Sequence, residues 1–141
     1  MTDHHSPMDI HTLVHRYFRA LDVRDFSPGW MRPFVTPDVR LEAPVGVEEG
    51  IEAATRLTEE ALGRFARTQH MASGLLVDVD GERGTASWNA LMTHVYDDDT
   101  LFTVGGRCEA DLHRTPDGWR FSRLAVRPVW TQGPPPVVPQ R

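Results

Sequence analysis

Apolar residues recur at helical spacing in two stretches of the first half of the chain. Residues 9–23 place one set on a single stripe: Ile10, Leu13, Val14, Tyr17 and Leu21. Residues 47–66 carry a second stripe, with glutamates on the opposite side: Ile51, Ala54, Leu57, Ala61, Leu62 and Phe65. Intervals of three and four residues bring side chains to one face of an α-helix. The pattern therefore predicts an amphipathic helix over each stretch, the first with Asp9 in its first turn.

The second half of the chain changes to a pattern typical of long β-strands. Runs rich in β-branched and aromatic residues are separated by three turn signals, which are DG at 80, DDD at 97 and PDG at 116. Such signals between strand-like runs indicate hairpins, so four long antiparallel strands are expected. A short strand over 39–44 is predicted before them, after an irregular stretch with three prolines. Helices followed by strands predict an α+β fold in which a curved antiparallel sheet wraps around the helices.

The composition is that of one globular domain, and it narrows the range of partners. The 141 residues are 40% hydrophobic and 25% charged, with a formal net charge of -5 and a pI near 5.7. Such a chain repels phosphate backbones, so no nucleic acid partner is expected. All 15 basic residues are arginine, which excludes catalysis through a lysine Schiff base. We expect a single domain over 9–132, a disordered N-terminus over 1–8 and an extended Pro-rich tail over 133–141.

Cysteine usage and hydropathy indicate the compartment. The chain holds one cysteine, Cys108, which cannot form an internal disulfide and fits a reducing environment. The N-terminal residues lack the apolar segment of a signal peptide, and no run approaches the roughly 20 apolar residues of a membrane helix. These features predict a cytoplasmic protein without a membrane partner. His11 and His15 stand four residues apart on the first helix, but no third ligand follows at suitable spacing, so no metal site is expected.

Several local strings resemble the nuclear transport factor 2-like superfamily, and within it the SnoaL-like and scytalone dehydratase branch. They are RYFRALDVRDF around Asp22, RTQH at 67–70, ALMTHVY around His94, EADLH at 109–113 and DGWRFSRLAVRPVW ending at Trp130. The resemblance implies a cone-shaped, cystatin-like fold with a pocket at the wide end. It also implies an enzyme that needs no metal or organic cofactor and acts on a small molecule, such as a polyketide or a related secondary metabolite.

The same resemblance implies that His70 and His94 form a catalytic pair, with Asp22 as the carboxylate that orients one of them. Removal of water from a β-hydroxy carbonyl compound needs a base for the α proton and an acid for the leaving hydroxyl. Imidazole serves either role near neutral pH, and a hydrogen-bonded carboxylate fixes its tautomer. We therefore predict that these three side chains meet inside one closed pocket.

Alternation along the strand of His94 suggests further contacts for the substrate. Trp88 and Met92 share a face with His94, which gives an apolar wall with one titratable side chain. Trp88, Met92, Trp30 and Tyr17 are the candidates for lining the pocket. Large apolar residues of this kind more often belong to the core, so these assignments depend on the pocket itself.

A polar face on the following strand admits two interpretations. Glu109 and Asp111 share this face with Arg107 and His113. The resemblance implies that Asp111 is a polar substrate contact and that Glu109 stands at a neighbouring hydroxyl position. Four polar residues in alternation are equally typical of a solvated surface, and the sequence leaves both interpretations open.

Other functions of the same fold stay open at this point. In scytalone dehydratase two tyrosines hold a water against the substrate, but the matching positions here are Leu21 and Ala43, so scytalone itself is not the expected substrate. An aldol or pericyclic cyclase that works mainly by pocket shape is one alternative, and a non-catalytic ligand-binding domain is another. The curved sheet is expected to leave an apolar outer face, which predicts a homodimer or homotrimer.

Overall fold

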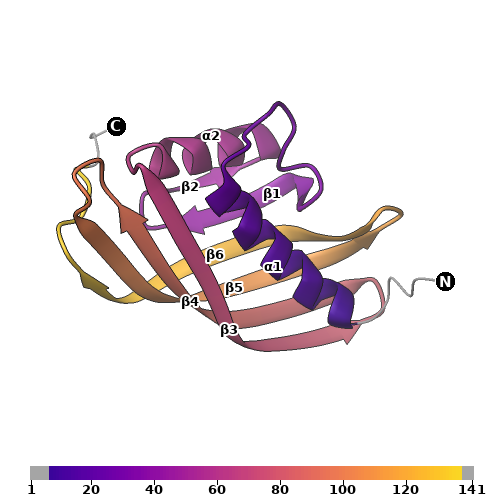
Figure 1. Ribbon diagram of the computed structural model, residues 1–141. Helices are drawn as coiled ribbons and strands as arrows, with labels where there is room; N and C mark the ends of the chain where they lie inside the picture. The colour runs from indigo at the N-terminus through magenta and orange to yellow at the C-terminus, as the bar shows by residue number, and fades with distance from the viewer. Residues whose placement is uncertain (1–6, 138–141) are drawn as a thin grey trace.

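Two helices and one six-stranded sheet make up the fold in the computed structural model of the chain, which describes residues 7–137 (Figure 1). In chain order the elements are α1 Pro7–Val23, β1 Val35–Ala43, β2 Gly46–Glu49, α2 Ile51–Leu62, β3 Arg67–Asp80, β4 Arg83–Val95, β5 Leu101–Thr115 and β6 Gly118–Gln132. The strands are ordered β2-β1-β6-β5-β4-β3. The predicted α+β fold with a curved, mostly antiparallel sheet is confirmed.

The three predicted turns each join neighbouring antiparallel strands. The turn between β3 and β4 contains Gly81, whose φ of 61° suits glycine in a tight hairpin. The other two turns connect β4 to β5 and β5 to β6 in the same way. β1 differs, because it pairs with β6 in parallel and with β2 in antiparallel. The long meander therefore places β3 at one edge of the sheet. This strand also contacts α1.

The second predicted helix is wrong at both of its ends. Residues 47–49 lie in β2, because they pair with residues 40–42 of β1. Gly50 then takes a φ of 91°, which allows the chain to turn from the strand into α2. The helix ends at Leu62 and the chain turns at 63–64 before β3. Glu48 and Glu49, which were expected on the polar side of the helix, are therefore strand residues.

Smaller differences occur at the ends of the domain. The predicted disorder over 1–8 is wrong for residues 7 and 8, which open α1 with a proline in its first turn, and residues 1–6 lie outside the described residues. β1 begins at Val35, earlier than predicted, because this residue pairs with Phe121 of β6. Residues 134–137 of the predicted tail have no regular secondary structure, and residues 138–141 lie outside the described range.

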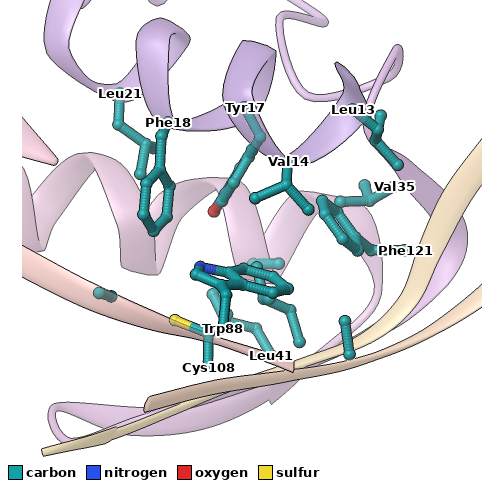
Figure 2. Close-up of a cluster of buried hydrophobic side chains, with 14 of the residues drawn as sticks. Leu13, Val14, Tyr17, Phe18, Leu21, Val35, Leu41, Trp88, Cys108 and Phe121 are labelled. Carbon is teal, nitrogen blue, oxygen red and sulfur yellow. The ribbon is translucent and has the colours of Figure 1, made fainter. Parts of the chain in front are cut away.

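The core lies between the helices and one face of the sheet, which we call the inner face (Figure 2). Val14 of α1 is fully buried, as are Cys108 and Phe121 of the sheet, and Trp88 is only 1% exposed. Burying a large apolar side chain stabilises a fold by roughly 1.5–3 kcal/mol. This packing fixes α1 across the sheet and thereby positions the residues at the C-terminal end of α1.

A bulge in β3 bends the sheet and exchanges the faces of its residues. The pairing of β3 with β4 shifts register between Ser73 and Leu76, and Gly74 within this interval has a φ of 62°. His70, before the bulge, and Val77, after it, are both partly buried although their numbers differ in parity. The extra residue therefore keeps both ends of the long strand packed against the helices.

Candidate active site

The C-terminal end of α1 is tied to the start of β3 by Arg24. This residue follows the helix with a φ of 62°, in the left-handed conformation common at helix C-termini. Its guanidinium donates to the backbone carbonyls of Phe65 and Ala66, at 2.8 Å each, and to that of Leu62. The Leu62 carbonyl ends α2, and the other two belong to the connection between α2 and β3. Arg24 thus holds the last turn of α1, which contains Asp22, against the beginning of β3.

The Asp22 carboxylate accepts three hydrogen bonds from β3. His70 Nδ1 lies 2.7 Å from Asp22 Oδ1, the His70 backbone N–H donates to Oδ2 at 2.9 Å, and the Thr68 hydroxyl donates to Oδ1 at 3.0 Å. Partial burial raises the pKa of Asp22, but the hydrogen bonds from His70 and Thr68 outweigh it and bring the pKa below its ordinary value. Asp22 is therefore ionised at neutral pH.

Both histidine rings are held through Nδ1. A carboxylate only accepts hydrogen bonds, so His70 Nδ1 carries a proton toward Asp22. His94 Nδ1 lies 2.9 Å from the Phe102 carbonyl oxygen, which also only accepts. In each neutral ring the lone pair is consequently on Nε2. The geometry fixes one tautomer for both imidazoles and makes Nε2 the basic atom in each.

The two imidazoles lie next to each other in an aromatic environment. Their ring centroids are 6.0 Å apart, the Phe18 ring packs at a tilt 5.3 Å from that of His70, and the Phe65 ring packs at a tilt 4.6 Å from that of His94. The His70 side chain is 5% exposed. Burial lowers the pKa of His94, as does its proximity to His70, and the opposing effects of Phe102 and Asp22 are smaller. His94 is therefore neutral at pH 7. The structure brings the side chains of Asp22, His70 and His94 together on the inner face, and their catalytic role in a closed pocket stays a prediction.

Three of the predicted substrate contacts also face the core. Trp88 is 1% exposed, Tyr17 4% and Met92 7%, and all three belong to the same buried cluster. Met92 is the cross-strand neighbour of His70, and the Trp88 ring lies 6.1 Å from that of Phe18. Trp88 and Met92 share the inner face with the histidine pair, and Tyr17 of α1 packs in the core that this face covers.

Glu109 and Asp111 lie on the opposite face of the sheet, which we call the outer face. Both pair with arginines of β6: Arg123 Nη2 is 3.6 Å from Glu109 and Arg123 Nη1 is 3.8 Å from Asp111. Asp111 also lines an open groove of about 590 Å³ with Arg83, at the hairpin end of β4 far from His94. Glu109 and Asp111 thus lie on the solvated surface of the sheet, which is the second of the two interpretations, and not beside the histidines.

Trp30 is also separate from the histidine pair. Its indole N–H donates to Glu59 Oε1 of α2 at 3.1 Å, and its ring packs 4.7 Å from that of Phe26. Trp30 therefore joins the connection after α1 to α2, and its donor already has a partner within the protein.

Sequence reasoning missed two residues that build the site, Arg24 and Thr68, and one residue of the core, Cys108. Cys108 faces the core as the cross-strand neighbour of Trp88, and burial raises the pKa of its thiol to about 12, so the thiol is neutral. The burial of Cys108 could have been predicted from the sequence, because apolar Cys108, Ala110 and Leu112 alternate with polar residues. No local pattern indicated the roles of Arg24 and Thr68, because each forms its hydrogen bonds with residues distant in sequence.

The donors of this site suit proton transfer. In the range 7–137 there is no group of three or more His, Cys, Asp or Glu side chains placed to hold a metal ion. The same stretch contains no helix of the length and apolar character needed to span a bilayer. An ionised carboxylate with two imidazoles supplies bases and a charge that stabilises an imidazolium.

Comparison with known protein families agrees with the observed fold and with the family that the short sequence motifs resemble. The family model described as a SnoaL-like domain matches residues 5–125. The chain belongs to the SnoaL-like family. A relative of this SnoaL-like chain is Rv2910c, an uncharacterized protein of Mycobacterium tuberculosis. The two are 30% identical over 122 residues, which cover 82% of this chain and 80% of the relative. The resemblance to the nuclear transport factor 2-like superfamily is thereby confirmed.

Solved structures with low sequence identity share the architecture of the SnoaL-like chain. A "Putative Scytalone Dehydratase" from Novosphingobium aromaticivorans superposes with a TM-score of 0.81 at 19% identity, covering 93% of this chain and 89% of that one. The hexachlorocyclohexane dehydrochlorinase LinA-type3 from Novosphingobium barchaimii gives a TM-score of 0.77 at 16% identity, covering 96% and 99%. At these identities the likeness establishes the fold.

Proposed function

We propose that this SnoaL-like protein is a cofactor-independent lyase that removes water from a β-hydroxy carbonyl compound. The observation that carries the proposal is the 2.7 Å contact between His70 Nδ1 and Asp22 Oδ1, beside a second imidazole held in the same tautomer. Two structural neighbours bear names that refer to elimination reactions, a dehydratase and a dehydrochlorinase. Polyketides and related secondary metabolites are the substrate class that the family resemblance implies.

In the proposed reaction, His70 Nε2 takes the proton from the carbon next to the substrate carbonyl. The electron pair of this C–H bond forms the new C=C bond, and the bond from the β carbon to the hydroxyl oxygen breaks. The proton on His70 then passes to the departing hydroxyl, so that water leaves and the ring returns to its neutral form. Asp22 stabilises the transient imidazolium through Nδ1.

His94 orients the leaving hydroxyl in this scheme. Its lowered pKa keeps the ring neutral, with Nε2 available to accept a hydrogen bond from the hydroxyl. A neutral ring whose Nδ1–H is engaged by Phe102 is a poor proton donor at Nε2. We therefore assign both proton transfers to His70, on the same face of the substrate as the hydroxyl that His94 positions.

The test is incubation with a panel of β-hydroxy ketones, aromatic polyketide intermediates included, followed by mass spectrometry for the loss of one water. His70→Gln should abolish the loss, and His94→Gln should slow it by less than His70→Gln does. His113→Gln, which alters an exposed outer-face histidine, serves as the matched control. A greater effect at His94 than at His70 would transfer the role of base to His94.

The same assay separates the alternatives. A cyclase that works by pocket shape gives a product of unchanged mass and tolerates His70→Gln. A ligand-binding domain binds members of the panel without converting any of them. Both results contradict the lyase proposal, and neither depends on knowing the natural substrate beforehand.

We also propose a homo-oligomer, dimer or trimer, that uses the outer face of the sheet. Met71, Leu91 and Trp130 are 56%, 40% and 48% exposed, and the strand register places them in one row. Trp130 lies across Gly105 in this row, since a Cβ there would come within 2.1 Å of the indole. Such an apolar row is typical of a protein contact. Leu91→Glu should shift the elution volume toward that of a monomer in size-exclusion chromatography with light scattering.

A further inference from the structure

Arg24 stands in an unfavourable backbone conformation at the end of α1. Its N–H donates to the Ala20 carbonyl at 3.1 Å, which closes the last turn of the helix, and its φ is 62°. Glycine is the usual residue at this point of a helix, because a Cβ is strained in the left-handed conformation. Capping alone therefore does not account for an arginine here, and its presence indicates a role for the side chain.

The Arg24 guanidinium holds one short segment, residues 62–66, through three backbone carbonyls. It donates to the carbonyls of Phe65 and Ala66, at 2.8 Å each, and to that of Leu62. Leu62 is the last residue of α2, and the carbonyls at the C-terminal end of a helix carry partial negative charge that favours a cation. A planar group with five N–H donors can serve several carbonyls at once. The segment is thereby fixed relative to the end of α1.

The same segment supports His94. The Phe65 ring packs 4.6 Å from the His94 ring. The Ala66 N–H donates to the Val95 carbonyl at 2.7 Å, which joins the segment to β4 at the residue after His94. Phe65 and Ala66 thus bind Arg24 through their carbonyls and contact His94 or its strand through other groups. A displacement of this segment would therefore change the surroundings of the His94 ring.

The end of α1 that carries Arg24 also supports His70. Asp22 lies two residues before Arg24, in the last turn of α1, and His70 Nδ1 is 2.7 Å from its carboxylate. The Thr68 hydroxyl and the His70 N–H donate to the same carboxylate from β3, which lies beside α1 (Figure 1). Hydrogen bonds weaken steeply when their distance or angle departs from the favoured range. The contact of Asp22 with His70 therefore depends on where α1 ends.

We infer that Arg24 is a positioning residue for both histidines at once. Its guanidinium holds Asp22 against His70. Through the same three carbonyls it holds Phe65 against His94. Arg24 acts only through these neighbours, and its guanidinium takes no part in the proton transfers. The inference deepens the proposed function, and it rests on that function only for the expected effect on turnover.

Proton NMR of the two imidazoles, recorded without substrate, tests the inference. The His70 Nδ1–H proton, bound to a carboxylate, gives a downfield signal that His70→Gln assigns. The carbon-bound ring protons of His94 are shifted by the neighbouring Phe65 ring, and His94→Gln assigns them. Arg24→Gly removes the guanidinium and relieves the left-handed backbone, so this variant should stay folded. Arg24→Gln, whose amide offers two N–H donors instead of five, is the second variant.

Both variants should change the signals of both histidines. The His70 Nδ1–H signal should move upfield, and its exchange with water should become at least about tenfold faster. The His94 ring protons should lose the shift that Phe65 causes. Turnover should fall by about 10- to 100-fold in kcat, with KM within about threefold, because the reacting groups are displaced but no substrate contact is removed.

Glu59→Ala is the matched control. It removes the 3.1 Å contact with Trp30, which also joins the connection after α1 to α2 but involves no residue beside the histidines. Both imidazole signals should stay in place in this variant. Unchanged signals in the folded Arg24 variants, or a response from only one of the two histidines, would overturn the inference. Because the signals need no substrate, this failure is distinguishable from failure of the lyase proposal, in which no substrate loses water.

Discussion

On the inner face of the sheet His70 contacts Asp22 at 2.7 Å, and on the outer face Arg123 contacts Glu42 at 2.8 Å. The distances are nearly equal, but the surroundings differ. His70 is 5% exposed and packs against Phe18, whereas Arg123 is 27% exposed and has further carboxylates as neighbours. Solvent and competing charges weaken any single outer pair. Proton chemistry is thus expected on the inner face and structural support on the outer one.

The largest expected contrast compares one carboxylate from each face. Asp22→Asn should lower the turnover of the lyase by about 10³- to 10⁴-fold, since an amide can neither fix the tautomer of His70 nor stabilise its imidazolium. Glu109→Gln, the matched change on the outer face, should leave turnover within about twofold. The measurement is the initial rate on the substrate found in the panel assay. Comparable losses in both variants would remove the functional distinction between the faces.

Next in size is the contrast in packing. Phe121 is fully buried on the inner face, and Phe121→Ala should lower the free energy of unfolding by about 3–5 kcal/mol. Leu76 is 69% exposed, and Leu76→Ala should change the free energy of unfolding by less than about 0.5 kcal/mol. Urea unfolding followed by tryptophan fluorescence measures both. A similar loss at Leu76 would mean that this residue is covered in solution, as an oligomer contact would require.

This contrast also shows how far the sequence predicts the fold. Alternation correctly grouped Trp88 with His94, because every second residue of an unbroken strand keeps to one face. It also grouped Glu109 with Asp111 but could not say which face turns inward, since polar residues occur on either. The buried neighbour Cys108 decides the question in the structure. On this strand the small apolar residues Cys108 and Ala110 predict the buried face better than the charged residues between them do.

The contacts that build the site were harder to predict from the sequence than the faces of the strands. Local strings predicted Asp22, His70 and His94, yet the placement of Asp22 depends on Arg24, whose guanidinium reaches carbonyls about forty residues ahead in the chain. β2 was missed because its residues pair with β1, and only that pairing overrides their helical spacing. In both cases the determining interaction is between distant segments, which local periodicity does not contain.

A smaller effect is expected from the outer ion pairs. Arg123 donates to Glu42 at 2.8 Å and lies near Glu109 and Asp111. Arg123→Gln should lower the free energy of unfolding by about 1 kcal/mol in low salt, and by less in high salt, because exposed ion pairs are screened. Arg67→Gln, at a more exposed pair with Asp99, is the control and should have less effect. A loss that does not change with salt would indicate packing by the Arg123 stem instead of charge.

The smallest expected effect is a pH dependence that belongs to the inner face alone. Burial lowers the pKa of His94 in the folded state, so the unfolded chain binds this proton more readily. Stability is therefore lost as pH falls below about 6.5, the ordinary histidine value, toward the lower folded pKa. Asp22 adds a second loss at more acidic pH, since its lowered pKa contributes stability above about 3.9 that disappears as pH falls through the folded value.

His94→Gln isolates the first of these losses. The variant should show a shallower decline in the free energy of unfolding between about pH 7 and pH 5 than the unaltered chain, whatever its stability at pH 7. His113→Gln changes an exposed histidine of the outer face and should leave the slope unchanged. Identical slopes for all three proteins would show that His94 titrates equally in both states. The neutral ring assigned to it in the elimination would then lose its physical basis, while the contact between His70 and Asp22 would be unaffected.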